Sequence, residues 1–167
     1  HHGRNELGHL HHLLALNISA PPDLAEEAPL QAAVDAVRAM GGEAVICHPY
    51  WHGCTCADLM GLEGVLGLEI YNHDCEVSVN RGDCSMVWDD LLARGVGWPA
   101  IAVDDAHFHR PDFLGGYTNV KARELSVEGI MDGLRNGHFY ASGGPEIYDV
   151  RFEDNQVVVE CSAARRI

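Results

Sequence analysis

The sequence has few basic residues and groups none of them into a run. Its 167 residues include 11 Lys plus Arg against 25 Asp plus Glu, which gives a formal net charge of −14. Proteins that bind nucleic-acid phosphates or an anionic membrane surface owe much of their affinity to clustered cations. The composition therefore argues against both kinds of partner. An anionic substrate would need a local source of positive charge.

Long apolar runs and closely paired cysteines are also missing. No stretch has the length and apolar character of a membrane-spanning segment. The six cysteines include no Cys-x-x-Cys pair, so neither a zinc ribbon nor a thioredoxin-like redox motif is supported. Because the cysteines are scattered and no signal-peptide pattern is present, we expect reduced thiols in a cytoplasmic protein.

Histidine, by contrast, is abundant. The chain has 11 histidines, several of them beside Asp or Glu. Neutral imidazole and carboxylate are the usual ligands of divalent transition metal ions. The composition therefore predicts a metal site. His1 and His2, which open the chain, are either native residues or the remnant of a purification tag.

Strand-like and helix-like segments alternate along most of the chain. Apolar strand patterns occupy residues 13–18, 43–48, 65–71, 98–103 and 117–122, and amphipathic helix patterns occupy 30–40, 85–94 and 126–136. This alternation predicts an α/β fold with a mainly parallel sheet, either open or curled into a barrel. Residues 147–152 and 157–161, joined by four polar residues, predict a C-terminal β-hairpin.

Polar residues follow the carboxyl ends of several predicted strands, the edge where parallel α/β folds build their sites. They are His48, Glu69, Asn72, Asp104, Asp105 and His107. Asp105 and His107 are two residues apart, so in extended geometry both side chains point the same way and can share an ion. Pro49 favours an extended backbone for His48. We therefore expect His48, Asp105 and His107 to meet at one metal site.

Three further residues could contribute to such a site. Trp51, close to His48, could wall the site and exclude water, and His12 stands at the entry to the first strand with a fixed orientation. His9 and His11 are expected to be exposed or to lie outside the ligand set. Lys121 is either a local cation for a phosphate or an ordinary surface lysine.

In this order and spacing, the motifs resemble the polymerase and histidinol phosphatase (PHP) domain. The residues that carry the resemblance are His48-Pro49-Tyr50-Trp51, Glu69-Ile70-Tyr71-Asn72, Val103-Asp104-Asp105-Ala106-His107 and Phe139-Tyr140-Ala141-Ser142-Gly143-Gly144-Pro145. The resemblance implies a distorted seven-stranded βα barrel that holds up to three Zn, Mn or Fe ions and hydrolyses phosphoesters. It also implies that His12, His48, Asp105 and His107 are metal ligands, the last three being catalytic.

The sequence departs from the family at its start. The opening His-x-His strand of the family, the Asp and His after it, and a glutamate ligand would all precede His1. Since a complete βα barrel needs roughly 200 residues or more, we expect the C-terminal part of a PHP protein. Residues 1–145 would form an incomplete barrel with an incomplete site. Residues 146–167 would form a hairpin that belongs to the same domain or begins an appended β module.

These expectations together predict a metal-dependent phosphoesterase acting on a small phosphorylated substrate. Clustered ions would activate water and supply the missing positive charge. Asn72, Asp104 and Glu69 would orient ligands, and Trp51 and Lys121 would contact substrate. Two alternatives stay open. One is a carboxylic or carbamate ester hydrolase of the same fold, in which Trp51 and Tyr50 wall an apolar pocket. The other is a non-catalytic metal-binding PHP module.

Overall fold

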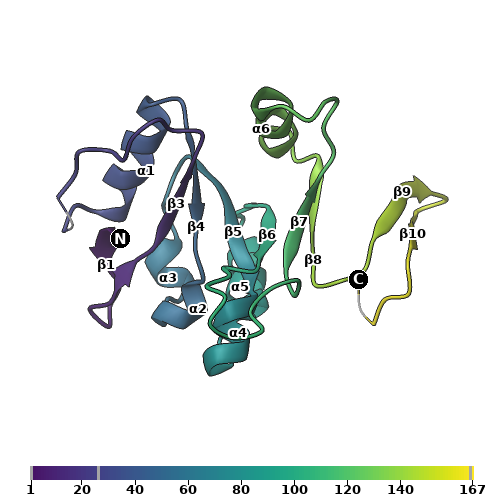
Figure 1. Cartoon of the computed structure of the whole chain (residues 1–167), viewed down its shortest axis with the longest axis horizontal. Coiled ribbons are helices and arrows are strands. Elements are labelled where there is room, and N and C mark those ends of the chain that lie inside the picture. Colours follow the sequence, from purple (N-terminus) through teal and green to yellow (C-terminus); the bar gives the residue numbers. More distant parts are fainter. Residues whose placement is uncertain (1, 26, 166) are drawn as a thin grey trace.

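A four-stranded mixed sheet forms the centre of the computed structural model, which describes residues 2–25, 27–165 and 167. The strand order is β3 (Leu13–Leu16), β4 (Glu43–Ile46), β5 (Val65–Asn72) and β6 (Ala100–Val103). The last three strands are parallel, whereas β3 runs antiparallel to β4 (Figure 1). The carboxyl ends of β4, β5 and β6 therefore lie at one edge of the sheet.

Two helices cover one face of this sheet, and its central strands are buried and mostly apolar. All four residues of β4 are buried, as expected of a parallel strand packed on both sides. On one face, α1 (Leu30–Ala39) buries Val34 and Val37 against Ala44. On the same face, Leu91 of α5 (Ser85–Ala93) packs in a cluster that includes Leu68 and Leu30 of α1. Both helices lie where the amphipathic patterns predict them.

Three short helices follow the carboxyl ends of the parallel strands. They are α2 (Pro49–His52), α3 (Cys56–Leu59) and α4 (His73–Val79). Thr55 and Asp58 form a capping box at the start of α3, and the Asn72 side chain caps α4 by accepting a hydrogen bond from the Cys75 amide. Such caps satisfy the amides that a helix start leaves unpaired. They also fix how the chain leaves each strand.

Beyond β6, the chain forms a smaller unit. Strands β7 (Tyr117–Val120) and β8 (Phe139–Ser142) pair antiparallel and are joined by α6 (Val127–Arg135). Ser126 caps α6 as its position predicts, accepting from the Gly129 amide. The Thr118 hydroxyl exchanges hydrogen bonds with the backbone of Ala102 and so links β7 to β6.

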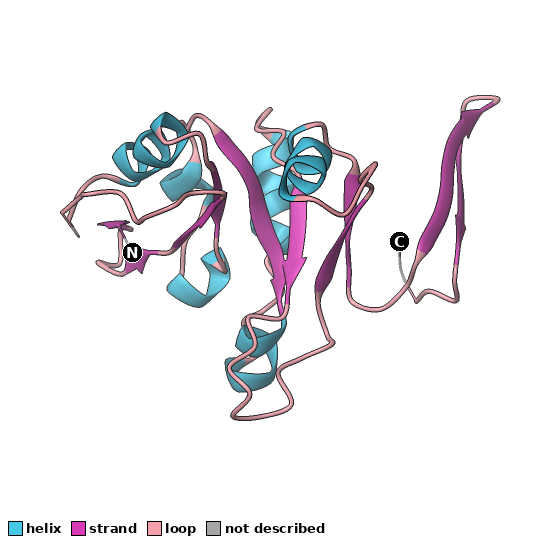
Figure 2. Cartoon of the chain, turned by 45° about the horizontal axis from the view of Figure 1, so that its top comes forward, coloured by secondary structure: helices cyan, strands magenta, loops and turns pink. Residues whose placement is uncertain are grey.

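Each end of the chain carries an antiparallel hairpin. At the N-terminal end, β1 (His2–Arg4) pairs with β2 (Leu10–His11). At the C-terminal end, β9 (Ile147–Glu153) pairs with β10 (Gln156–Cys161), which confirms the predicted hairpin. Figures 1 and 2 both show this second hairpin standing apart from the rest of the chain.

The α/β class is confirmed, but the described strands close into no barrel. The expected parallel alternation holds for β4, β5 and β6 only. Strand β3 is antiparallel because the irregular segment after it, which contains Pro21 and Pro22, carries the chain back before α1 begins. Strands β7 and β8 pair with each other instead of extending a parallel sheet.

Within the described residues, no helix is long and apolar enough to span a membrane. All six cysteines are free thiols, in line with the predicted reduced state.

Candidate metal centre

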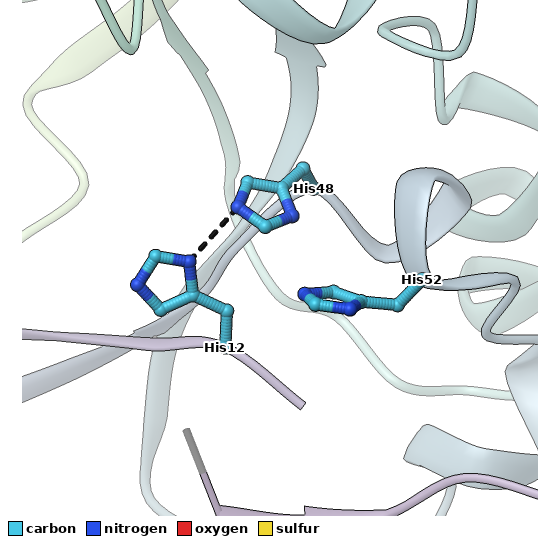
Figure 3. A group of neighbouring side chains, drawn as sticks. All are labelled: His12, His48 and His52. Atoms are coloured by element: carbon cyan, nitrogen blue, oxygen red, sulfur yellow. Dashed lines mark hydrogen bonds between the residues drawn. The ribbon is translucent and has the colours of Figure 1, made fainter. Parts of the chain in front are cut away.

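Three histidines converge at the carboxyl edge of the sheet (Figure 3). His12 lies between β2 and β3, His48 follows β4, and His52 is the last residue of α2. His12 Nδ1 is 2.9 Å from His48 Nε2, and one ring nitrogen from each of the three residues lies within 4.8 Å of the others. A set of three imidazoles is a common ligand set for zinc and related ions.

Burial keeps these imidazoles uncharged. His48 and His52 are buried, and desolvation lowers the pKa of all three histidines. For His52, desolvation and the neighbouring His48 together lower the pKa to about 4. Neutral imidazole is the form that binds a metal ion. In addition, His48 Nδ1 is buried and has no hydrogen-bond partner within the described residues. The donor set and this orphaned nitrogen fit a divalent ion.

Asp105 adds a carboxylate to this group. Its Oδ2 lies 3.9 Å from His48 Nε2 and accepts a 3.1 Å hydrogen bond from the Asn72 amide. Asn72 also donates to Glu69, whose carboxylate accepts from the His48 backbone amide at 2.8 Å. Burial raises the pKa of Glu69. A network of buried hydrogen bonds therefore connects the ends of β4, β5 and β6. It runs through Glu69 and Asn72, which the sequence predicts as orienting groups.

The backbone at both His48 and Asp105 is left-handed, not extended as predicted. His48 has φ 26° and ψ 59° because Glu69 holds its amide while α2 begins at the next residue. Asp105 has φ 52°. Beside it, the Asp104 carboxylate accepts hydrogen bonds from the amides of Leu114, Gly115 and Gly116, which turns the chain away from a strand path. Asp105 and His107 consequently belong to different clusters.

His107 belongs to a second group, with Asp74 and Asp112. Single ligand atoms from these three residues lie within 4.8 Å of one another. His107 Nδ1 is 3.8 Å from Asp74 Oδ2, and its side chain is 54% exposed. Asp112 is fully buried and accepts hydrogen bonds from the amides of His107 and Phe108. The structure thus brings His12, His48 and Asp105 together but places His107 beside different carboxylates.

Sequence reasoning missed His52, Asp74 and Asp112. The four-residue spacing from His48 to His52, across a proline that can start a helix, is a signal for His52. Asp74 follows Asn72 by two residues, so its place near the strand end was also open to prediction. Asp112 has no local signal because only the folded loop brings it to His107.

The remaining candidates are placed as follows. Trp51 is 46% exposed, and its ring centroid lies 5.6 Å from that of His48 and 4.9 Å from that of His52. His11, expected to be exposed or outside the site, is buried with Nδ1 3.4 Å from Cys54 Sγ, whereas His9 is exposed.

Lys121 is exposed and lies away from the site. Its amide bonds the His138 carbonyl at the far end of the β7–β8 pair. On the adjoining α6, Arg135 binds Glu43, the first residue of β4. Lys121 therefore lies at the opposite edge of the sheet from His48.

A cavity of about 420 Å³ adjoins one of the three histidines, His52. It is lined by Arg4, Gly8, His9, Leu10, Trp51 and His52. A larger cavity of about 830 Å³ lies between α2, α3, α4 and α5 and is lined by none of the candidate ligands. Of these two cavities, only the smaller one is lined by a candidate ligand.

Comparison with models of known protein families finds none that matches the chain, and comparison with curated proteins finds no match.

Proposed function

We propose that the chain is the catalytic part of a PHP-type metal-dependent phosphoesterase. The observation that carries the proposal is the convergence of His12, His48 and His52, with Asp105 beside them, at the carboxyl edge of the parallel strands. These four residues would hold a divalent ion, with Zn, Mn and Fe as the candidates that suit imidazole and carboxylate ligands. The free thiols favour a reducing compartment such as the cytoplasm.

When bound, such an ion lowers the pKa of a coordinated water and polarises a phosphoryl oxygen. The residues of the chain supply the surroundings. Glu69 and Asn72 fix His48 and Asp105 by hydrogen bonds, which limits the motion of the ligands. Trp51 lies edge-on to the rings of His48 and His52 and would wall this side of the site. His107 Nδ1 lies 3.8 Å from Asp74, and His107 would act as a further ligand or give a proton to the leaving alkoxide.

The test combines metal analysis with activity. We expect bound transition metal by elemental analysis, and hydrolysis of p-nitrophenyl phosphate that is stimulated by Mn²⁺ or Zn²⁺ and lost with a chelator. Asp105→Ala should reduce turnover by two orders of magnitude or more, whereas Asp132→Ala, a charge change on exposed α6, should not. Undiminished turnover by Asp105→Ala at full metal loading would overturn the assignment.

One observation favours a second candidate function. The cavity beside the histidines includes Leu10 and Trp51, which suits an apolar leaving group such as that of an aryl carboxylic or carbamate ester. Faster metal-dependent hydrolysis of p-nitrophenyl acetate than of the phosphate would favour this candidate. Metal binding without turnover of either ester would indicate a non-catalytic module.

A further inference from the structure

We propose that Arg110, on the loop between β6 and β7, binds the phosphate group of the substrate and makes the site select phosphomonoesters. This inference rests on the proposed function and names the cation that such a substrate requires.

The need for this cation follows from the charge of the chain. The net charge is −14, and a phosphomonoester near neutral pH carries close to two negative charges. Several arginines are committed elsewhere. Arg38 and Arg135 both bind Glu43 at the opposite edge of the sheet, and Arg94 binds Asp90 on α5. Lys121 also lies at that opposite edge. Arg110 is a cation placed beside the second group, that of Asp74, His107 and Asp112.

Contacts with Asp74 place Arg110 at the site. Arg110 Nε is 3.3 Å from Asp74 Oδ1, and the other oxygen of the same carboxylate is 3.8 Å from His107 Nδ1. Asp74 lies in the first turn of α4, two residues after Asn72, which bonds Asp105. The Asp74 charge also acts on His48, where it opposes the larger lowering of the pKa by burial. Asp74 therefore links Arg110 to His107, and its charge reaches the candidate ligand His48.

The loop that carries Arg110 is held at both ends. At one end, Asp104 binds the amides of residues 114–116. Inside the loop, Asp112 binds the amides of His107 and Phe108, and its own amide donates to the Arg110 carbonyl. A loop with its backbone fixed in this way loses little entropy when one of its side chains binds a ligand.

The guanidinium group has donors to spare. Its Nε faces Asp74, and within the described residues no hydrogen bond is found for Nη1 or Nη2. The side chain is 44% exposed. A guanidinium presents its N–H groups as a planar fork that matches two oxygens of a phosphate. Asp74 can therefore hold one edge of Arg110 while the other edge receives the substrate.

The test measures binding of inorganic phosphate to the Mn²⁺-loaded chain by calorimetry, together with kcat and KM for p-nitrophenyl phosphate and bis(p-nitrophenyl) phosphate. Arg110→Gln should raise the dissociation constant of phosphate at least about tenfold, the usual loss for a charged hydrogen bond. It should raise KM more for the monoester than for the diester, because the monoester carries the extra charge. Arg110→Lys, which keeps the charge without the fork, should fall between.

Arg94→Gln is the matched control, because it also removes one exposed arginine with one carboxylate partner. It should leave phosphate binding within about twofold of the parent chain, as expected of an exposed ion pair. The inference would be overturned if Arg110→Gln bound phosphate as tightly as the parent chain does, or if Arg110→Gln and Arg94→Gln lost the same affinity. Neither result would contradict metal-dependent hydrolysis. If Arg110→Gln fails to fold, Arg110→Lys decides the point by the same measurement.

Failure of the proposed function gives a different result. A parent chain that binds phosphate but hydrolyses neither ester, with binding lost only in Arg110→Gln, would support an anion site in a non-catalytic protein. A parent chain that does not bind phosphate at all would overturn the inference.

Discussion

At the scale of single residues, the candidate centre depends most on the amide side chain of Asn72. This residue is fully buried. It donates to Glu69 and Asp105 and accepts from the Cys75 amide. One side chain therefore ties the end of β5 to a candidate ligand after β6 and to the start of α4. Buried donors and acceptors left without partners cost about 1–3 kcal/mol each, so its loss should affect both stability and metal binding.

We expect Asn72→Ala to lower the free energy of unfolding by about 2–3 kcal/mol. It should also weaken Mn²⁺ or Zn²⁺ binding about 10- to 100-fold, which is the usual effect of removing a group that orients a ligand. Urea denaturation and chelator competition measure the two effects. Ser126→Ala, which removes the cap of α6, is the control. It should cost about 1 kcal/mol without changing metal affinity. Unchanged metal affinity in Asn72→Ala would show that Asp105 needs no such support.

The stability of the metal-free chain should depend on pH through His52. Its pKa is lowered to about 4 by burial and by the neighbouring histidines, from 6.5 in an unfolded chain. Between these values the unfolded chain binds more protons than the folded one, so stability falls as pH is lowered from 6.5 toward 4. The pKa values of His12 and His48 are also lowered and act in the same direction.

His52→Gln should therefore reduce the pH dependence without abolishing it. The measurement is the urea midpoint at several pH values between 7 and 4.5, with a chelator present. His138→Gln, which changes an exposed histidine at the opposite edge of the sheet, is the control and should keep the full slope. An equal slope in the parent chain and His52→Gln would contradict the prediction.

At this scale the sequence predicts which residues matter better than how they are oriented. The rule that sites form at the carboxyl ends of parallel strands correctly places His48 near Asp105. It cannot predict the left-handed backbone at either residue, since that depends on the carboxylates of Glu69 and Asp104 and on where α2 begins. The separation of His107 from Asp105 follows from the same backbone turn.

At the scale of elements, the loop between β6 and β7 is shaped by carboxylates. Burial tends to raise the pKa of Asp104, but hydrogen bonds from the amides of residues 114–116 outweigh it, so the pKa is lowered. The loop also needs a glycine where it returns to the sheet. A Cβ on Gly115 would lie 2.2 Å from the His73 ring. The loop is thus a defined structural element and not a flexible connection.

Asp104→Ala should free residues 114–116, the part of this loop that returns to the sheet. We expect a loss of about 2–3 kcal/mol in stability, because three amides lose a charged acceptor, and faster hydrogen exchange at the amides of residues 114–116. Asp104→Asn keeps one acceptor oxygen and should lose less. Exchange rates at these amides that match the parent chain would show that other contacts hold the loop.

Helix length explains which elements the sequence reveals. Helices α1, α5 and α6 have nine or ten residues, long enough for an amphipathic pattern and its terminal signals to be recognised. Helices α2, α3 and α4 have four to seven residues and are too short to show that periodicity. Two of these short helices carry His52 and Asp74, which explains why both were missed.

At the scale of the whole molecule, strand direction is the main feature that the sequence could not supply. Apolar patterns locate β3, β7 and β8 but contain no information on the partner or direction of each strand. The direction of β3 depends on the long segment before α1, and the pairing of β7 with β8 depends on contacts distant in sequence. The alternation of strands and helices predicts either an open sheet or a barrel, and the barrel itself is implied only by the resemblance to the PHP domain.

The C-terminal hairpin should be separable from the rest of the chain. Strands β9 and β10 make their main contacts with each other, and Figures 1 and 2 show them apart from the sheet. One face of the hairpin is charged, with Arg151 binding Asp149, Glu153 and Glu160. The other face exposes apolar side chains, namely Tyr148, Val150, Phe152 and Val157. An isolated two-stranded hairpin adds little stability of its own.

Removing residues 146–167 should therefore leave the thermal midpoint within a few degrees of the parent value. Metal affinity should be unchanged, because the candidate ligands found among the described residues all lie outside the hairpin. The truncated chain should also aggregate less, since an exposed apolar face favours association. Circular dichroism, metal titration and light scattering measure these outcomes. A chain of residues 1–145 that fails to fold would place the hairpin in the same folding unit as the sheet, with the hydrogen bond from the Ile147 amide to the Tyr140 hydroxyl as the first contact to examine.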